Sequence, residues 1–123
     1  MRNMSFSKTT QQVRDKDKTV TRRFGWGRLR RGEQVCAIEK GMGLKKGEKV
    51  VRLATIEVIK TNTERVDAIT TDDVVKEGFP NLTPEQFIDD VLLKDARIKI
   101  PGTNRTRPAR RDDLCNRIEF KYV

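Results

Sequence analysis

Lys18 and Thr21 lie three residues apart within residues 17–32, a stretch that also carries five arginines and the only tryptophan of the chain. A threonine hydroxyl attacks a carbonyl near neutral pH only when a base removes its proton. The chain has no histidine, so a neutral lysine is the available base. Burial, or the neighbouring charges of Arg22 and Arg23, would lower the pKa of Lys18 toward that role.

The spacing of this pair raises a geometric difficulty. In a regular strand, residues 18 and 21 point to opposite faces. Lys18 would therefore have to lie at a helix–strand junction, or the strand would have to be bulged. From residue types alone, the simpler interpretation is a surface lysine beside a strand-forming threonine.

The residue inventory excludes several kinds of site. Cys36 and Cys115 are the only cysteines, and without histidine or a CxxC motif a zinc site has too few nitrogen and sulfur ligands. Ser-His-Asp and Cys-His nucleophiles are excluded for the same reason. We expect no metal and no cofactor, and both cysteines to be buried free thiols.

The same arginines also suit phosphate binding, and an exposed Trp26 could stack on a base. Trp26 could equally cover one end of the core. The residues that we predict to contact nucleic acid are Arg22, Arg23, Trp26, Arg28, Arg30, Arg31, Lys45 and Lys46.

Charge is distributed unevenly along the chain, whose net charge is +9. Residues 1–60 carry 16 basic and 6 acidic groups, residues 61–95 carry 3 and 9, and residues 96–123 carry 8 and 3. If the two basic ends meet in space, they form a positive face that attracts polyanions. No apolar run is long enough to span a membrane, and the N-terminus lacks the apolar region of a signal peptide. We expect one cytoplasmic domain over residues 1–123.

Hydrophobic patterning predicts the elements that must position these residues. It indicates a short helix over 7–16 with Ser7 as N-cap, and four strands. The strands are expected at 18–24, 34–40, 49–66 and 114–123. The long third strand has apolar residues on both faces, as in a strand that closes a barrel.

Two helices are expected between the third and the last strand. The first covers 71–77 and ends at Gly78. The second begins at Thr83, where Thr-Pro-Glu-Gln is a capping box with proline at N1. Ile98 and Ile100 suggest a short strand, and residues 103–113 are expected to be a basic loop. The order favours an α+β fold, a small mixed β-barrel of about five strands with helices at the rim.

This layout resembles the ASCH domain family of the PUA-like superfamily along nearly the whole chain. The resemblance is carried by Ser5-Phe6-Ser7, by Lys18-Thr19-Val20-Thr21-Arg22-Arg23, by Leu29-Arg-Arg-Gly-Glu33, by 69–87 and by Arg117-Ile-Glu-Phe-Lys-Tyr122. The stretch Glu39-Lys-Gly-Met-Gly-Leu-Lys-Lys46 is similar to small phage or prophage members. The resemblance implies a pseudo-barrel with a cleft between the first strand and the helical segment, a role in RNA binding, and a bacterial or phage-infected host cell.

A bacterial subgroup of that family hydrolyses N4-acetylcytidine to cytidine and acetate. By motif matching, its lysine, threonine and glutamate correspond to Lys18, Thr21 and Glu77, although Asp72 or Asp73 could be the matching acid. The glutamate would donate a proton to the leaving amine.

Three functions therefore remain open on the sequence. The first is a module that binds single-stranded or modified RNA without turnover, which we favour because the charge is more extensive than a neutral nucleoside requires. The second is a metal-independent amidohydrolase acting on N4-acetylcytidine-like nucleosides, and the third is a ribonuclease. The partner is RNA or a nucleoside in each case, with no membrane involved. The sequence does not indicate an oligomeric state.

Overall fold

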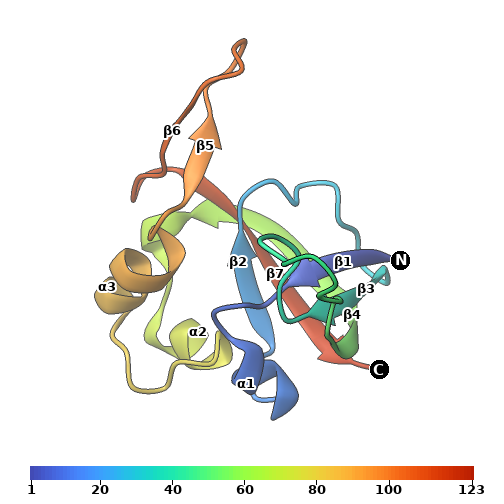
Figure 1. Ribbon diagram of the computed structural model, residues 1–123. Helices are drawn as coiled ribbons and strands as arrows, with labels where there is room; N and C mark the ends of the chain where they lie inside the picture. The colour runs from blue at the N-terminus through green and yellow to red at the C-terminus, as the bar shows by residue number, and fades with distance from the viewer.

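The computed structural model describes residues 1–123, which form seven strands and several short helices (Figure 1). In chain order the elements are β1 Arg2–Ser5, α1 Thr10–Arg14, β2 Val20–Arg23, β3 Gln34–Ile38, β4 Arg52–Arg65, the 3-10 helix η1 Val66–Ala68, α2 Thr71–Lys76, α3 Pro84–Phe87, the π-helix η2 Ile88–Leu92, β5 Arg97–Lys99, β6 Thr106–Pro108 and β7 Leu114–Tyr122.

Five of the strands form one curled sheet in the order β1-β3-β4-β7-β2. β1 runs parallel to β3, and the other three pairs are antiparallel. β1 and β2 are the two edges of this sheet, so the barrel is not closed by backbone pairing between them. The helices lie to one side of the curled sheet (Figure 1). The expected α+β architecture of about five strands with helices at the rim is confirmed.

β4 is the strand that gives the sheet its curl. It extends over 14 residues, and its pairing with β7 shifts register between Val58 and Lys60. A bulge of this kind bends a strand and increases its twist, which allows β4 to pair with β3 over its first residues and with β7 from Ile56 to Arg65. The long third strand expected from the sequence is thus present, although it begins at Arg52 rather than at residue 49.

The apolar side chains form two separate clusters. Ten buried residues, among them Phe6, Val35 and Phe120, fill the inside of the curled sheet. Seven more, among them Val74 and Phe87, pack between the helices and the far end of β4 and β7. Because the clusters are separate, the seam between them has room for polar groups.

Two details at the N-terminus differ from the prediction. β1 was not predicted, because Arg2–Ser5 has no β-branched residue and pairs with β3, a strand far from it in the sequence. The N-cap of α1 is Thr9 rather than Ser7, and Thr9 makes no side-chain capping bond. The helix is accordingly shorter than the predicted 7–16.

The two later helices follow the sequence signals closely. α2 is capped by Thr70, whose hydroxyl accepts a hydrogen bond from the main-chain N–H of Asp73. Thr83 and Gln86 form the expected capping box at the start of α3. α3 then continues directly into η2, and the buried side chains of Phe87, Ile88 and Leu92 form its inner face.

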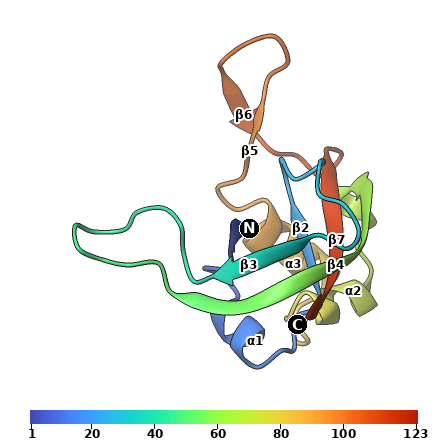
Figure 2. The same ribbon diagram turned by 90° about the vertical axis from the view of Figure 1, so that its right-hand side faces the viewer.

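Residues 103–113, expected to be a loop, include a strand. β6 pairs with β5 in a two-stranded hairpin, and Arg107 holds Asp113 through two hydrogen bonds of 2.7 Å. This hairpin projects from the body of the molecule, and residues 39–51 between β3 and β4 project as a second arm (Figure 2). Alternation of apolar residues did not reveal β6, since most of its side chains are exposed.

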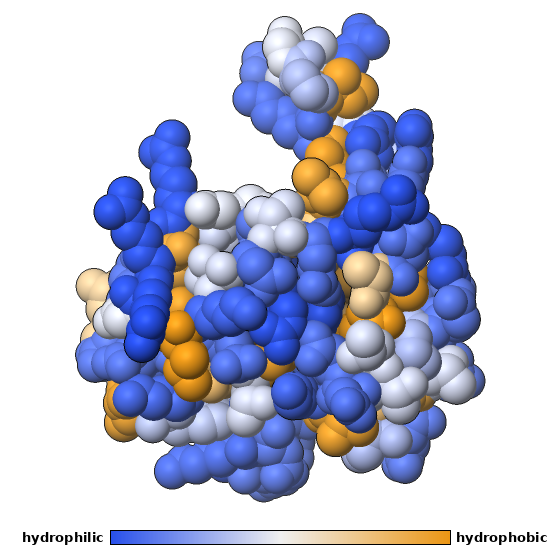
Figure 3. Space-filling model, turned by 180° about the vertical axis from the view of Figure 1, so that it is seen from behind, coloured by the Kyte–Doolittle hydropathy of each residue, from blue (hydrophilic) through white to orange (hydrophobic).

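The face opposite to that of Figure 1 is predominantly hydrophilic, with hydrophobic side chains in small separated areas (Figure 3). None of the helices is both long and apolar enough to cross a membrane.

Candidate functional site

A pocket of about 770 Å³ lies between the two apolar clusters. Its walls come from residues 5–9 and 21–24, from the end of the helical segment at 87–96, and from three single side chains, Lys18, Met42 and Glu77. Both sheet edges therefore border it, since Ser5 ends β1 and Thr21 to Arg23 belong to β2. Three phenylalanines, Phe6, Phe24 and Phe87, contribute aromatic surface.

Lys18 reaches this pocket because it precedes β2 rather than belonging to it. The segment before β2 is fixed by its neighbours: Thr19 N–H donates to Lys76 O at 2.9 Å, and Phe120 N–H donates to Thr19 O at 3.0 Å. The Tyr122 hydroxyl also donates to Lys18 O, and burial raises the pKa of Tyr122 to about 12. Lys18 therefore lies between α1 and β2, as the spacing of Lys18 and Thr21 had required. Both residues line the same pocket.

Lys18 and Glu77 form a buried ion pair. The Lys18 ammonium donates to Glu77 Oε1 at 2.7 Å and to Glu77 O at 2.8 Å. Both side chains are almost completely buried, at 3% and 2% exposure. Burial lowers the pKa of Lys18, and Arg23 and Arg22 lower it further, although attraction to Glu77 opposes them. Glu77 is the C-cap of α2, so the end of a helix and the segment before β2 each supply one member of the pair.

The observed hydrogen bonds would leave a lone pair free on a neutral Lys18 and the hydroxyl proton free on Thr21. A neutral lysine would use both N–H groups on Glu77 and keep its lone pair free. Thr21 Oγ1 accepts a hydrogen bond of 3.2 Å from Arg23 Nε, so its own proton is free to be donated elsewhere. Lys18 and Thr21 form no hydrogen bond to each other in this structure, but the threonine proton and the lysine lone pair are both left available in the pocket that they line.

Arg22 organises the acidic side of the site. Its guanidinium, 1% exposed, binds Glu64, Asp73 and Glu77. Arg117 binds Asp73 as well, with Nε to Oδ2 at 2.7 Å, and together with Arg22 it holds the pKa of Asp73 well below its usual range. Arg22 is thus committed to three carboxylates, and it does not present its charge to a phosphate as the sequence had suggested.

Asp72 and Asp73, the alternative acids, do not take the place of Glu77. Asp73 faces Arg22 and Arg117, and Asp72 is exposed. Glu77 is the member of this acidic group that contacts Lys18. It accepts hydrogen bonds from two cations, Lys18 and Arg22, so here it is an acceptor rather than the expected proton donor.

The other residues predicted to contact nucleic acid are spread over the surface. Arg28, Arg30, Arg31, Lys45 and Lys46 are exposed, form no ion pair and do not line the pocket. Trp26 is half-buried, packs against the core of the curled sheet and lies under the Arg2 guanidinium at 4.7 Å. Trp26 therefore covers the core.

Arg23 and the partners of Arg22 complete the site. Arg23 lines the pocket and reaches from the edge strand β2 to the other edge strand, β1, where it donates to Ser5 O. Glu64 and Arg117, which hold Arg22 and Asp73, were not predicted as site residues. They lie on β4 and β7, and nothing in their local sequence distinguishes them from surface charges.

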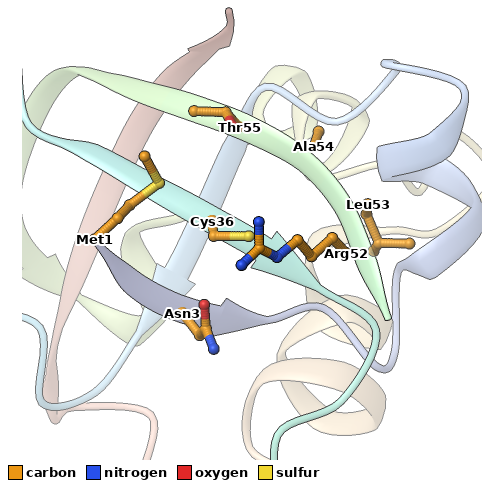
Figure 4. Close-up of a pocket in the computed structure, with 7 residues that line it drawn as sticks. All are labelled: Met1, Asn3, Cys36, Arg52, Leu53, Ala54 and Thr55. Carbon is orange, nitrogen blue, oxygen red and sulfur yellow. The ribbon is translucent and has the colours of Figure 1, made fainter. Parts of the chain in front are cut away.

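A second pocket of about 350 Å³ lies at the β1 edge of the sheet (Figure 4). Asn3, Cys36 and Thr55 are aligned across β1, β3 and β4, and the Arg52 side chain extends toward Cys36. The only hydrogen bond of the Cys36 thiol is to the neighbouring Ala37 O, and Arg52 forms no ion pair. This pocket pairs no base with a nucleophile, which makes the larger pocket the candidate site.

No family model matches the chain, and no curated protein matches it by sequence. Solved structures do match it. The ASCH domain from Lactobacillus crispatus superposes with a TM-score of 0.64 at 11% identity, over 98% of this chain and 79% of that one.

The chain has the ASCH fold. A protein from Enterococcus faecalis described by the family model DUF984 has a similar structure, with a TM-score of 0.65 at 15% identity over 95% of this chain and 68% of that chain. At these identities the likeness establishes the ASCH fold alone. The strand order and the helices beside the sheet belong to that fold, whereas the chemistry of the pocket rests on the residues of this chain.

Proposed function

We propose that the pocket is the active site of a small hydrolase that removes the acyl group from an N4-acylated cytidine. The observation that carries the proposal is the convergence of Lys18, Thr21 and Glu77 on one pocket. The substrate class follows from the resemblance of the Lys18–Arg23 stretch to the ASCH subgroup with that activity. A pocket of about 770 Å³ with phenylalanine walls is of the size that accepts a nucleoside.

In this proposal Thr21 Oγ attacks the acyl carbonyl carbon while Lys18 Nζ takes the threonine proton. Collapse of the tetrahedral intermediate breaks the C–N bond, and the electron pair leaves with the cytosine amine, which receives the proton from Lys18. Water then attacks the threonyl ester, Lys18 takes its proton, and cleavage of the ester C–O bond returns that proton to Thr21. Glu77 accepts hydrogen bonds from Lys18 throughout and keeps its amine directed.

The test is cytidine release from N4-acetylcytidine, followed by chromatography. Lys18→Met and Thr21→Val should each reduce release by about 1,000-fold or more, as expected for members of a catalytic unit. Lys60→Met and Thr19→Val are the matched controls, because Lys60 is exposed and Thr19 makes no side-chain hydrogen bond. Release that survives Thr21→Val would rule out threonine as the nucleophile.

A second candidate is RNA binding by the exposed cations, favoured by the five side chains Arg28, Arg30, Arg31, Lys45 and Lys46 that form no ion pair. Binding of a mixed single-stranded RNA should weaken steeply with salt, and Arg30→Gln should reduce the slope of log K against log salt by about 1. Arg65→Gln, whose guanidinium binds Asp67, should leave that slope unchanged. Shortening of the RNA during incubation would indicate a ribonuclease instead.

A further inference from the structure

Arg23 is an unusual charge in this pocket because no carboxylate contacts it. Five cationic side chains line the pocket. Lys18 and Arg22 bind carboxylates, Lys8 donates to the carbonyls of Val91 and Lys94 at the end of the helical segment, and Lys94 is exposed. Arg23 alone is partly buried without an acidic partner.

The Arg23 guanidinium is nevertheless held firmly. Nε donates to Thr21 Oγ1 at 3.2 Å, Nη2 donates to Ser5 O, and the group stacks on the Phe6 ring at 4.6 Å. Thr21 and Arg23 are two residues apart on β2, so their side chains share one face of the strand. Nη1 has no partner, and it belongs to a group already fixed beside the threonine hydroxyl.

A buried guanidinium is costly unless an opposite charge compensates it. Here burial lowers the pKa of Arg23 to about 10, against a weaker opposing attraction to Glu77. The group still carries its charge near neutral pH, and its unpartnered Nη1 is not among the buried atoms, so it is open to an anion that enters the pocket.

We propose that Arg23 is the anion-binding residue of the pocket, and that its free Nη1 binds the acyl oxygen as that oxygen becomes negatively charged and then binds the carboxylate that is released. This inference rests on the proposed hydrolase function. It adds a catalytic residue to Lys18, Thr21 and Glu77, and it places the acyl group of the substrate against Thr21 and the Phe6 side of the pocket. Fixed donors of this kind favour the transition state, because they are oriented before charge develops.

The experiment has a binding arm and a rate arm. In the binding arm, sodium acetate is titrated into ¹⁵N-labelled protein while the arginine Nε–H signals are recorded by NMR. The Arg23 signal should shift saturably with acetate, and the shift should be absent with sodium chloride at equal ionic strength. The binding should disappear in Arg23→Gln and be weakened in Arg23→Lys, whereas Arg65→Gln, whose side chain lies outside the pocket and is paired with Asp67, should bind acetate as the unaltered protein does.

In the rate arm, Arg23→Gln should lower kcat for N4-acetylcytidine by about 100-fold or more, with KM changed by less than about 3-fold. Arg23→Lys should recover part of the loss, and acetate should inhibit the unaltered enzyme but not Arg23→Gln. Acetate that leaves the Arg23 signal unmoved would overturn the inference even if the protein hydrolyses the nucleoside. Conversely, Arg23-dependent acetate binding in a protein that releases no cytidine would support the anion site and refute the proposed function.

Discussion

Gly78 approaches Gln12 so closely that a Cβ at position 78 would come within 2.7 Å of Gln12 Cγ and 2.9 Å of Gln12 Cβ. The backbone of Gly78 also has φ +101°, a conformation that L side chains rarely adopt. Gln12 lies on α1, the helix before Lys18, and Gly78 follows Glu77, the C-cap of α2. This contact therefore fixes the distance between α1 and the end of α2.

Gly78→Ala should therefore lower the free energy of unfolding by about 3 kcal/mol, the sum of backbone strain and overlap with Gln12. Urea unfolding measures the change. Gly43→Ala is the matched control, because Gly43 has φ +72° and a Cβ there would meet nothing within 4 Å, so it should cost only about 1 kcal/mol. Equal losses in the two variants would mean that Gln12 moves aside freely.

The rate of hydrolysis should rise with pH through the pKa of Lys18, since only the neutral amine can accept the threonine proton. Burial lowers that pKa, so the plateau should be reached below about 10.4, the ordinary value for lysine. Glu77→Gln removes the attraction that opposes this lowering, and the rising limb of kcat/KM should move to still lower pH. Glu33→Gln, which changes an exposed salt bridge to Arg2, should leave the limb in place. A limb that does not move in Glu77→Gln would show that Lys18 is not the titrating base.

Asp73 should make the protein sensitive to acid. Arg117 and Arg22 lower the pKa of Asp73 in the folded protein, so the stabilisation is fully present above about pH 4, the ordinary aspartate value, and is lost as pH falls toward the lowered value. The free energy of unfolding, measured in urea from pH 6 to pH 2.5, should fall more steeply for the unaltered protein than for Asp73→Asn. Asp72→Asn, one residue away and exposed, should retain the steep dependence.

The helix start at Thr83 can be tested in the same way. Its hydroxyl accepts from Gln86 N–H at 3.1 Å, so Thr83→Ala should lower the free energy of unfolding by about 1 kcal/mol. Thr71→Ala, at the exposed first residue of α2, removes no capping bond and should change stability by less than about 0.5 kcal/mol. A loss of similar size at both positions would point to helix propensity rather than capping.

Local patterns were sufficient for elements whose signals lie within one stretch of sequence. Thr83 to Gln86 predicted a helix start, Gly78 a helix end, and the alternation around Ile118 and Phe120 a terminal strand, and all three are present. β1 could not be predicted in this way, because its pairing with β3 depends on the curl of the whole sheet.

In the candidate site, too, residues close together in the sequence were predicted and residues that meet only in the fold were not. Lys18 and Thr21 were recognisable because they are close in sequence and match a family motif, and Glu77 followed only from that resemblance. The role of Arg22 depends on Glu64 and Asp73, which come from β4 and α2 and meet it only in the folded chain. An arginine beside aromatic residues suggests phosphate binding in a sequence, whereas the structure turns this one inward onto carboxylates.

The position of β2 at the edge of the sheet affects the order in which the strands can pair as the chain is synthesised. Its only neighbour is β7, which begins at Leu114, whereas β1, β3 and β4 can pair with one another earlier. During synthesis from the N-terminus, the strand that carries Thr21 and Arg23 has no partner until β7 has emerged, about 90 residues later. A chain that lacks β7 would leave β2 without its neighbour in the sheet, so the pocket lined by Thr21 and Arg23 would be assembled only once β7 is in place.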